Sequence, residues 1–264
     1  MADPWKIYDE LISAIPDDVT VTAGTVGMQW CRVATSDGGM GAALSFPDRS
    51  RPPLWNEKTY VGAPLRQIAS LAKSWNLSEA GVGVAAINAW HGGPRRAEAN
   101  GFTPCTANNW MQVFHPYSEA VTGKVVSVIG HFPFAPPPLA AAAELRILER
   151  STQNGDYPDP ACEYLLPDSD YVFISGSAFV NKTIPRLLEL ARDATTIVIG
   201  PSTPLSTILF EHGVDVVTGF VARTPDRLSD AMGGLAQAGM YDHGYRVEQS
   251  REDQGPVGQE TPLT

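Results

Sequence analysis

The sequence has few cysteines, no long apolar run and no leader-like start, and each shortage excludes a class of protein. Three cysteines are spread over 264 residues, too few and too scattered for a disulfide framework, so we expect reduced thiols and a cytoplasmic protein. No apolar run approaches the roughly 18 residues that a membrane span needs. The first residues, Met1 to Lys6, lack the basic stretch and apolar core of a secretory signal.

Positive charge is also scarce. The chain has 19 Lys and Arg against 29 Asp and Glu, a formal net charge of -10. Such a surface repels phosphate backbones and anionic lipids, so we expect neither nucleic acid nor a membrane as a partner. The sequence has no Walker-type Gly-Lys-Ser/Thr, no Gly-x-Ser-x-Gly and no Cys-x-x-Cys. These absences argue against a P-loop NTPase, a serine hydrolase of the elbow type and a motif-defined zinc site.

Residues 1–120 predict a small α+β domain. Apolar residues at helical spacing follow Asp3 and Pro4, which suit the cap and first turn of a helix. Two extended segments around a Gly-containing turn predict an antiparallel hairpin. The expected elements are a helix over 3–15, strands over 19–34 and 40–46, and helices beginning at Pro64 and Ser78.

Residues 121–245 predict a Rossmann-like domain, an open parallel sheet with helices on both faces. Short apolar runs alternate with helical segments, and each run is too apolar to have one face in water. The expected strands are 124–130, 144–149, 170–176, 195–200 and 214–219. Residues 246–264 are polar, acidic and free of aromatics, which predicts a flexible tail. The fold class is therefore α/β, with a second, α+β domain in front.

Several predicted strands end in glycine followed by small polar residues. Ligands of open parallel sheets bind beyond the carboxyl ends of the strands, where helix starts also bind anions. Each loop alone fits a tight turn equally well, but three loops on one edge favour a site. The candidate ligand-binding residues in these loops are Gly130, His131, Ser175, Gly176, Gly200, Ser202 and Thr203.

The first of these loops invites comparison with dinucleotide-binding proteins. Glu149 ends the second strand, 19 residues beyond Gly130, where an acidic residue often holds a ribose. However, Gly130-His-Phe-Pro-Phe is not Gly-x-Gly-x-x-Gly, and its side chains would obstruct a pyrophosphate. We therefore do not expect NAD, while Glu149 stays a candidate for binding an adenosyl or other small ligand.

The densest group of metal-ligand side chains lies between the second and third strands. Asp156, Asp159, Cys162 and Glu163 could share one side of a helix start and hold a transition-metal ion. By spacing alone, the favoured interpretation is different. Asp159 would cap the helix and Cys162 would pack in the core.

Several segments resemble a bacterial and archaeal family called putative heavy-metal chelation proteins. They are Asp156–Ala161, Glu163–Pro167, Ser175–Thr183, Gly200–Ser206 and Gly213–Val216, with Ala86–Ala89 in the first half. The resemblance covers most of the chain except the tail. It implies an enolase-N-like domain before a Rossmann-like domain, with a site in the cleft between them. The matching polar positions carried over as site candidates are Asn88, Asp156, Asp159, Asn181, Ser202 and Thr203.

Two functional hypotheses follow. In the first, the cleft binds a metal ion, a metal complex or a small anionic ligand, for heavy-metal chelation or metallophore handling. In the second, the same cleft is the active site of an enzyme for a small adenosyl- or carboxylate-containing substrate. A scaffold role ranks last, because it needs no polar loops on one sheet edge. Lateral association through the helices of the second domain would give a homodimer, which light scattering tests.

Overall fold

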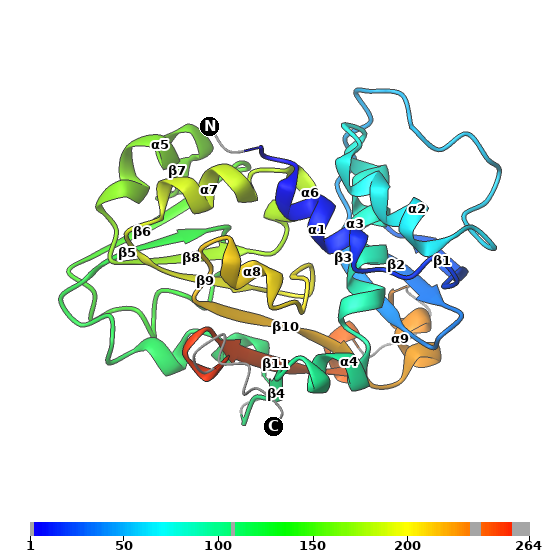
Figure 1. Cartoon of the computed structure of the whole chain (residues 1–264). Helices are drawn as coiled ribbons and strands as arrows, with labels where there is room; N and C mark the ends of the chain where they lie inside the picture. The colour runs from blue at the N-terminus through cyan, green and yellow to red at the C-terminus, as the bar shows by residue number, and fades with distance from the viewer. Residues whose placement is uncertain (1–2, 107–108, 233–238, 255–264) are drawn as a thin grey trace, which may run out of the picture.

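The computed structural model describes residues 3–106, 109–232 and 239–254. Figure 1 shows a small sheet with its helices beside a larger sheet with its own helices. The small sheet is antiparallel, in the order β1-β2-β3. Its strands and the helices of the first 100 residues are α1 (Lys6–Ser13), β1 (Val21–Val26), β2 (Trp30–Thr35), β3 (Met40–Leu44), α2 (Leu65–Ala69), η1 (Ser70–Lys73), α3 (Leu77–His91) and α4 (Pro94–Ala99).

The predicted hairpin is a three-stranded meander. The segment expected to be one long strand turns at Gly27, whose N–H donates to the carbonyl of Trp30 at 3.0 Å. The residues on both sides of this turn have the same Val- and Thr-rich, strand-like composition, so apolar periodicity alone did not indicate where the first strand ends.

Helix α3 covers one face of the small sheet at very short range. Asn76 caps it by accepting a hydrogen bond from the N–H of Glu79 at 3.2 Å. A Cβ placed on Gly41 of β3 would lie 2.1 Å from the backbone N of Ala89, so only glycine allows this approach. Helix α3 spans 15 residues. No helix among the described residues is long and apolar enough to cross a membrane.

The larger sheet has the order β4-β11-β10-β9-β8-β5-β6-β7. The run from β7 to β10 is parallel, while β11 and β4 are antiparallel to their neighbours. The order β6-β5-β8-β9-β10 is the flavodoxin-like doubly wound arrangement, so the predicted α/β class is confirmed. The strands are β4 (Thr103–Pro104), β5 (Val125–Ile129), β6 (Glu144–Glu149), β7 (Tyr157–Pro158), β8 (Tyr171–Ser175), β9 (Thr195–Ile199), β10 (Val216–Ala222) and β11 (Gly244–Ser250).

Alternate residues of these strands enter two different cores. Val128 packs with Phe114 on one face, whereas Ile129 packs on the opposite face with the helices between the strands. That second face carries η4 (Asp159–Ala161), α5 (Cys162–Leu165), η5 (Leu166–Asp168), α6 (Ala178–Asn181), α7 (Ile184–Leu190) and α8 (Ile208–Glu211). The first face is covered by Val113 and Phe114, which lie between the short η2 (Trp110–Gln112) and η3 (His115–Tyr117), and by the loop after β5. Among the described residues, no α-helix belongs to the core on this face.

The predicted flexible tail is wrong in its first part. Residues 244–250 form β11, which pairs with β10 along its whole length and buries Val247 in the core. Two short helices lie near this strand, η6 (Met240–His243) before it and η7 (Glu252–Gln254) after it. Residues 255–264 of the predicted tail lie outside the described residues. Helix α9 spans Pro225–Met232, and residues 233–238 after it also lie outside the described residues.

The two sheets are joined at several points. The hydroxyl of Tyr8 in α1 donates to the carbonyl of Phe179 in α6 at 2.8 Å. Nε2 of His212, the residue after α8 (Ile208–Glu211), lies 2.5 Å from a carboxylate oxygen of Glu10. Strand β4, from the first 120 residues, pairs with β11 at the edge of the larger sheet. The domain boundary at residue 120 stays a prediction.

His91 makes stability depend on pH. It is buried at the end of α3, with Nε2 3.0 Å from the carbonyl of Leu11. Burial, reinforced by Arg96, lowers the pKa of His91 to about 4. The pKa of His91 in the unfolded chain lies near 6.5. Above pH 6.5 the imidazole is neutral in both states, so it does not reduce the stability of the fold. As pH falls toward 4, the unfolded chain binds a proton at His91 that the folded chain does not, and the protein loses stability.

We therefore expect the His91→Gln variant to lose less stability than the wild type between pH 6.5 and pH 4.5. Over the full pKa shift of His91, the wild type would lose on the order of 3 kcal/mol more of its free energy of unfolding than the variant. Urea denaturation at several pH values measures it, with the exposed His115→Gln as the matched control. Equal slopes in the wild type and His91→Gln would show that His91 does not couple protonation to folding.

Candidate functional site

A pocket of about 880 Å³ lies at the carboxyl ends of β5, β8 and β9. It opens where the strand order changes direction, between β5 and β8, which is where doubly wound sheets bind ligands. Its volume is typical of small-molecule sites. Leu44 at the end of β3 also lines it, so both sheets contribute to its wall. We call it the larger pocket.

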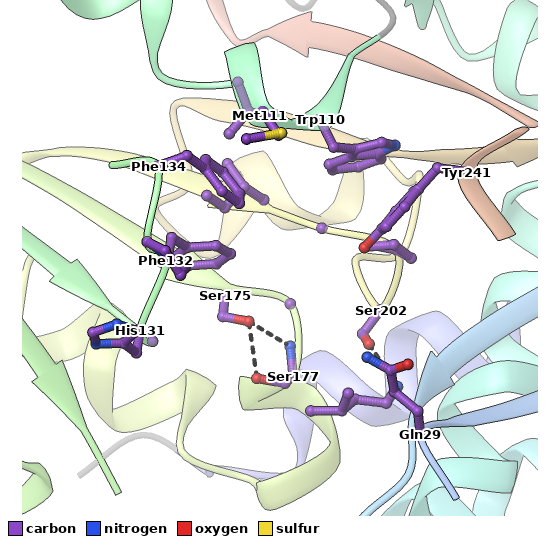
Figure 2. A pocket seen from close by; sticks show the side chains of 18 of the residues that line it. Gln29, Trp110, Met111, His131, Phe132, Phe134, Ser175, Ser177, Ser202 and Tyr241 are labelled. Carbon is purple, nitrogen blue, oxygen red and sulfur yellow. Dashed lines mark hydrogen bonds between the residues drawn. The ribbon is translucent and has the colours of Figure 1, made fainter. Parts of the chain in front are cut away.

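Three serines are among the polar residues that line the larger pocket (Figure 2). Ser175 and Ser177 hydrogen-bond to one another through their hydroxyls at 2.9 Å. Ser202 accepts a hydrogen bond from the N–H of Leu44 at 2.8 Å, which leaves its own hydroxyl proton available to donate. A ligand in the pocket would therefore meet hydroxyl groups that can donate or accept.

Glycines allow the strand-end loops to approach one another. Gly130 and Gly200 have φ values of 110° and 117°, a region that favours glycine. A Cβ on Gly176 would lie 2.4 Å from Oγ1 of Thr203. These positions explain why glycine follows each strand, independently of any ligand.

The opposite side of the larger pocket is aromatic (Figure 2). It consists of Trp110, Met111, Phe132, Phe134 and Tyr241. The ring centroids of Trp110 and Tyr241 are 5.4 Å apart, and those of Phe132 and Phe134 are 5.7 Å apart. We call this set the aromatic wall. The sequence did not predict this wall, although Phe132 and Phe134 lie two and four residues after Gly130.

His131, which lines the larger pocket, forms a pair with Asp156. Nδ1 of His131 lies 3.0 Å from both carboxylate oxygens of Asp156, whose side chain is 2% exposed. The N–H of His131 donates to Glu149 at 3.0 Å, and Glu149 also accepts from the N–H groups of Arg150 and Ser151. Glu149 therefore holds two loops together through backbone contacts.

A smaller pocket of about 400 Å³ adjoins the larger one. Both are lined by Leu44, Gly130, Glu149, Ser175 and Ser177. The smaller pocket adds Asp48, Arg150, Asp159, Asn181 and Thr183. The side-chain oxygen of Asn181 accepts from the N–H and hydroxyl of Thr183 at 3.1 and 2.7 Å, so it also shapes the loop after α6.

Two predicted site residues lie behind the loops rather than in the lining. Nδ2 of Asn88 donates to the carbonyls of Ala42 at 2.8 Å and Pro201 at 3.3 Å, which joins α3, β3 and the loop after β9. Thr203 is 2% exposed and contacts the Gly176 loop. Both residues position the loops that face the pockets.

The four predicted metal ligands have different surroundings in the structure. Asp156 binds His131, and Asp159 faces the smaller pocket. Cys162 is buried, and burial raises the pKa of its thiol to about 12. Glu163 is paired with Arg186 at the surface, which lowers the pKa of Glu163. Among the described residues, no group of three or more His, Cys, Asp or Glu side chains is arranged to hold a metal ion.

The fold and the pocket define a doubly wound α/β protein with a second, antiparallel sheet beside the carboxyl ends of its parallel strands. Two family models, both described as putative heavy-metal chelation, match residues 8–91 and 112–247. The second alone covers more than half of the chain, and the chain belongs to this family.

Solved structures and a relative found by sequence similarity are consistent with membership of this family. A protein of unknown function from Desulfitobacterium hafniense DCB-2, in the same family, is 38% identical with a TM-score of 0.86, covering 94% of this chain and 98% of that one. A family member of unknown function from Pyrococcus horikoshii shares the fold at 19% identity and a TM-score of 0.75, covering 94% and 99%. An uncharacterised protein of Methanocaldococcus jannaschii is 26% identical over 209 residues, 76% of this chain and 78% of its own length.

Proposed function

We propose that the chain binds a small metal complex, a metal ion already wrapped by an organic ligand, in the larger pocket. The observation that carries this proposal is the pocket of about 880 Å³ at the switch point of the sheet. The family description points to metal chelation. The described side chains do not form a three-residue ligand group, so the organic ligand would supply most of the donor atoms and the protein would enclose the complex.

The experiment compares free metal ions with their complexes. Ni²⁺, Co²⁺ and Zn²⁺ are added alone and with excess histidine, citrate or bipyridine, and the melting temperature is measured. We expect a rise of roughly 5 °C for a bound complex at about 100 times its Kd, and little change with free ions. Isothermal titration then gives the affinity. If no complex raises the melting temperature, the proposal is wrong.

A filled pocket provides the control. Ser177→Trp places a large side chain at the junction of the two pockets, whereas Ser13→Trp places one on the exposed surface of α1. We expect Ser177→Trp to abolish the temperature shift and Ser13→Trp to preserve it. Equal shifts in both variants would place binding elsewhere on the protein.

The His131–Asp156 pair supports a second candidate, an enzyme acting on a small organic substrate. A buried carboxylate that holds a histidine in the lining of a pocket is an arrangement found in general acid–base catalysis. Incubation of the protein with a metabolite extract, followed by mass spectrometry, would reveal a consumed compound. We expect His131→Gln to slow that consumption at least about 100-fold. If the wild type consumes nothing, binding without catalysis is favoured.

A further inference from the structure

The charges around the two pockets indicate the sign of their ligand. Glu149 and Asp242 line the larger pocket, and Asp48 and Asp159 join Glu149 around the smaller one. Among the described residues that line either pocket, Arg150 is the one Lys or Arg. A ligand with net negative charge would therefore meet several carboxylates and a single guanidinium, in a protein of formal charge -10.

Glu149 has a central place in this field. It lines both pockets, and three backbone N–H groups hold its carboxylate in position at 2.8 to 3.0 Å. A carboxylate fixed by the backbone cannot swing away from a ligand without breaking those bonds. An anion in the larger pocket would therefore lie near a negative charge that does not move.

The aromatic wall favours the opposite charge. The faces of Trp, Tyr and Phe rings have a negative electrostatic potential and attract cations, by about 0.5 to 2 kcal/mol for each good contact. The wall provides Trp110, Phe132, Phe134 and Tyr241 around the same space. The serine hydroxyls on the other side are neutral and can accept hydrogen bonds as readily as donate them.

We propose that the ligand of this site carries a positive charge next to a flat apolar face. A methylated heteroaromatic ring has this chemistry, and so does a cationic metal complex with aromatic ligands. The inference rests on the proposed function, because it takes the larger pocket as the binding site. It departs from the small anionic ligand expected from the sequence.

Three compounds of the same shape and different charge test the inference. They are 1-methylnicotinamide, which is a cation, the neutral 3-methylbenzamide and the anion 3-methylbenzoate. Affinities are measured by isothermal titration and saturation-transfer NMR in 0.15 M salt, which screens charges beyond about 8 Å. We expect the cation to bind at least about 10 times more tightly than the neutral compound, and the anion to bind most weakly.

A fourth probe distinguishes the two sources of such a cation. Tris(bipyridine)cobalt(III) is a positively charged complex that does not exchange its ligands. If it displaces 1-methylnicotinamide, the site accepts cationic metal complexes. If it does not, the site selects purely organic cations.

An aromatic variant links the preference to the pocket. Tyr241→Leu removes one ring from the aromatic wall while keeping an apolar side chain, at a position that is 42% exposed. We expect it to reduce the ratio of cation to neutral affinity several-fold. The matched control is Tyr164→Leu, at an 80% exposed tyrosine of α5, which should leave the ratio unchanged.

The outcomes separate the two proposals. If the neutral compound or the anion binds as well as the cation in the larger pocket, the charge inference is overturned and the proposed function stands. If none of the three compounds binds, the charge inference also fails, while the metal-complex panel with Ser177→Trp still decides the proposed function. A cation preference that survives Tyr241→Leu unchanged would contradict the role of the aromatic wall.

Discussion

The Gly41→Ala variant is expected to unfold with a free energy lower than that of the wild type by roughly 3 kcal/mol or more. The added Cβ would lie 2.1 Å from the N of Ala89 and 2.2 Å from the carbonyl oxygen of Ala85. Both atoms belong to the backbone of α3, which cannot rotate aside as a side chain can. Gly41 also pairs with Val33 of β2, so β3 can retreat only by distorting the sheet.

Gly24→Ala is the matched control, because it makes the same change in the same small sheet. There the new Cβ would lie 3.5 Å from the carbonyl oxygen of Arg32, an ordinary contact. We expect a change within about 1 kcal/mol. Urea denaturation followed by circular dichroism gives both values. Similar losses in the two variants would mean that the cost comes from the strand conformation of alanine and not from the contact with α3.

Asn88→Asp should destabilise the protein by roughly 3 to 5 kcal/mol near neutral pH. The amide of Asn88 donates to the carbonyls of Ala42 and Pro201. A carboxylate cannot donate, so the substitution would place a buried negative charge against two carbonyl oxygens and leave both without their donor. Since Pro201 belongs to the loop after β9, we also expect weaker ligand binding in the larger pocket.

The penalty of Asn88→Asp should depend on pH in a defined direction. Burial raises the pKa of the new carboxyl group above its unfolded value, so the variant gains protons on folding. Its loss of stability is therefore smallest at low pH and grows as pH rises through the folded pKa. Denaturation at pH 5 and pH 8 measures this, with the exposed Asn56→Asp as control. A loss that is the same at both pH values would contradict a buried carboxylate.

The strands at the centre of the larger sheet were predictable because they are buried on both faces. Residues 125–129 and 195–199 form strands within one residue of the predicted ranges. A short, continuous apolar run is typical of a parallel strand that is covered on both faces. Strand β11 was not predictable in this way. Arg246, Glu248 and Gln249 make it polar, and its structure comes from pairing with β10, a contact that leaves no local pattern.

The candidate site divides along the same line. The loops after β5, β8 and β9 could be placed together from sequence, because parallel strands bring their carboxyl ends to one edge. The aromatic wall could not be predicted, because Trp110 and Tyr241 are brought to this edge by segments far apart in the chain. Asn88 was linked to the site by the family resemblance, and the structure adds that its amide supports a loop from behind.

The edge of the larger sheet has a consequence for synthesis on the ribosome. Strand β4 finds its partner in β11, and Thr103 bonds to Glu248 across 145 positions of the chain. At a translation rate of about 5 to 20 residues per second, β4 waits on the order of 10 s for that partner to be made. Near the end of this interval, once β10 has been made and before β11 follows it, β10 is also an uncovered edge, a surface on which chains aggregate. This edge of the sheet is therefore the last to be covered during synthesis. We expect a chaperone that protects the nascent chain from aggregation to bind there.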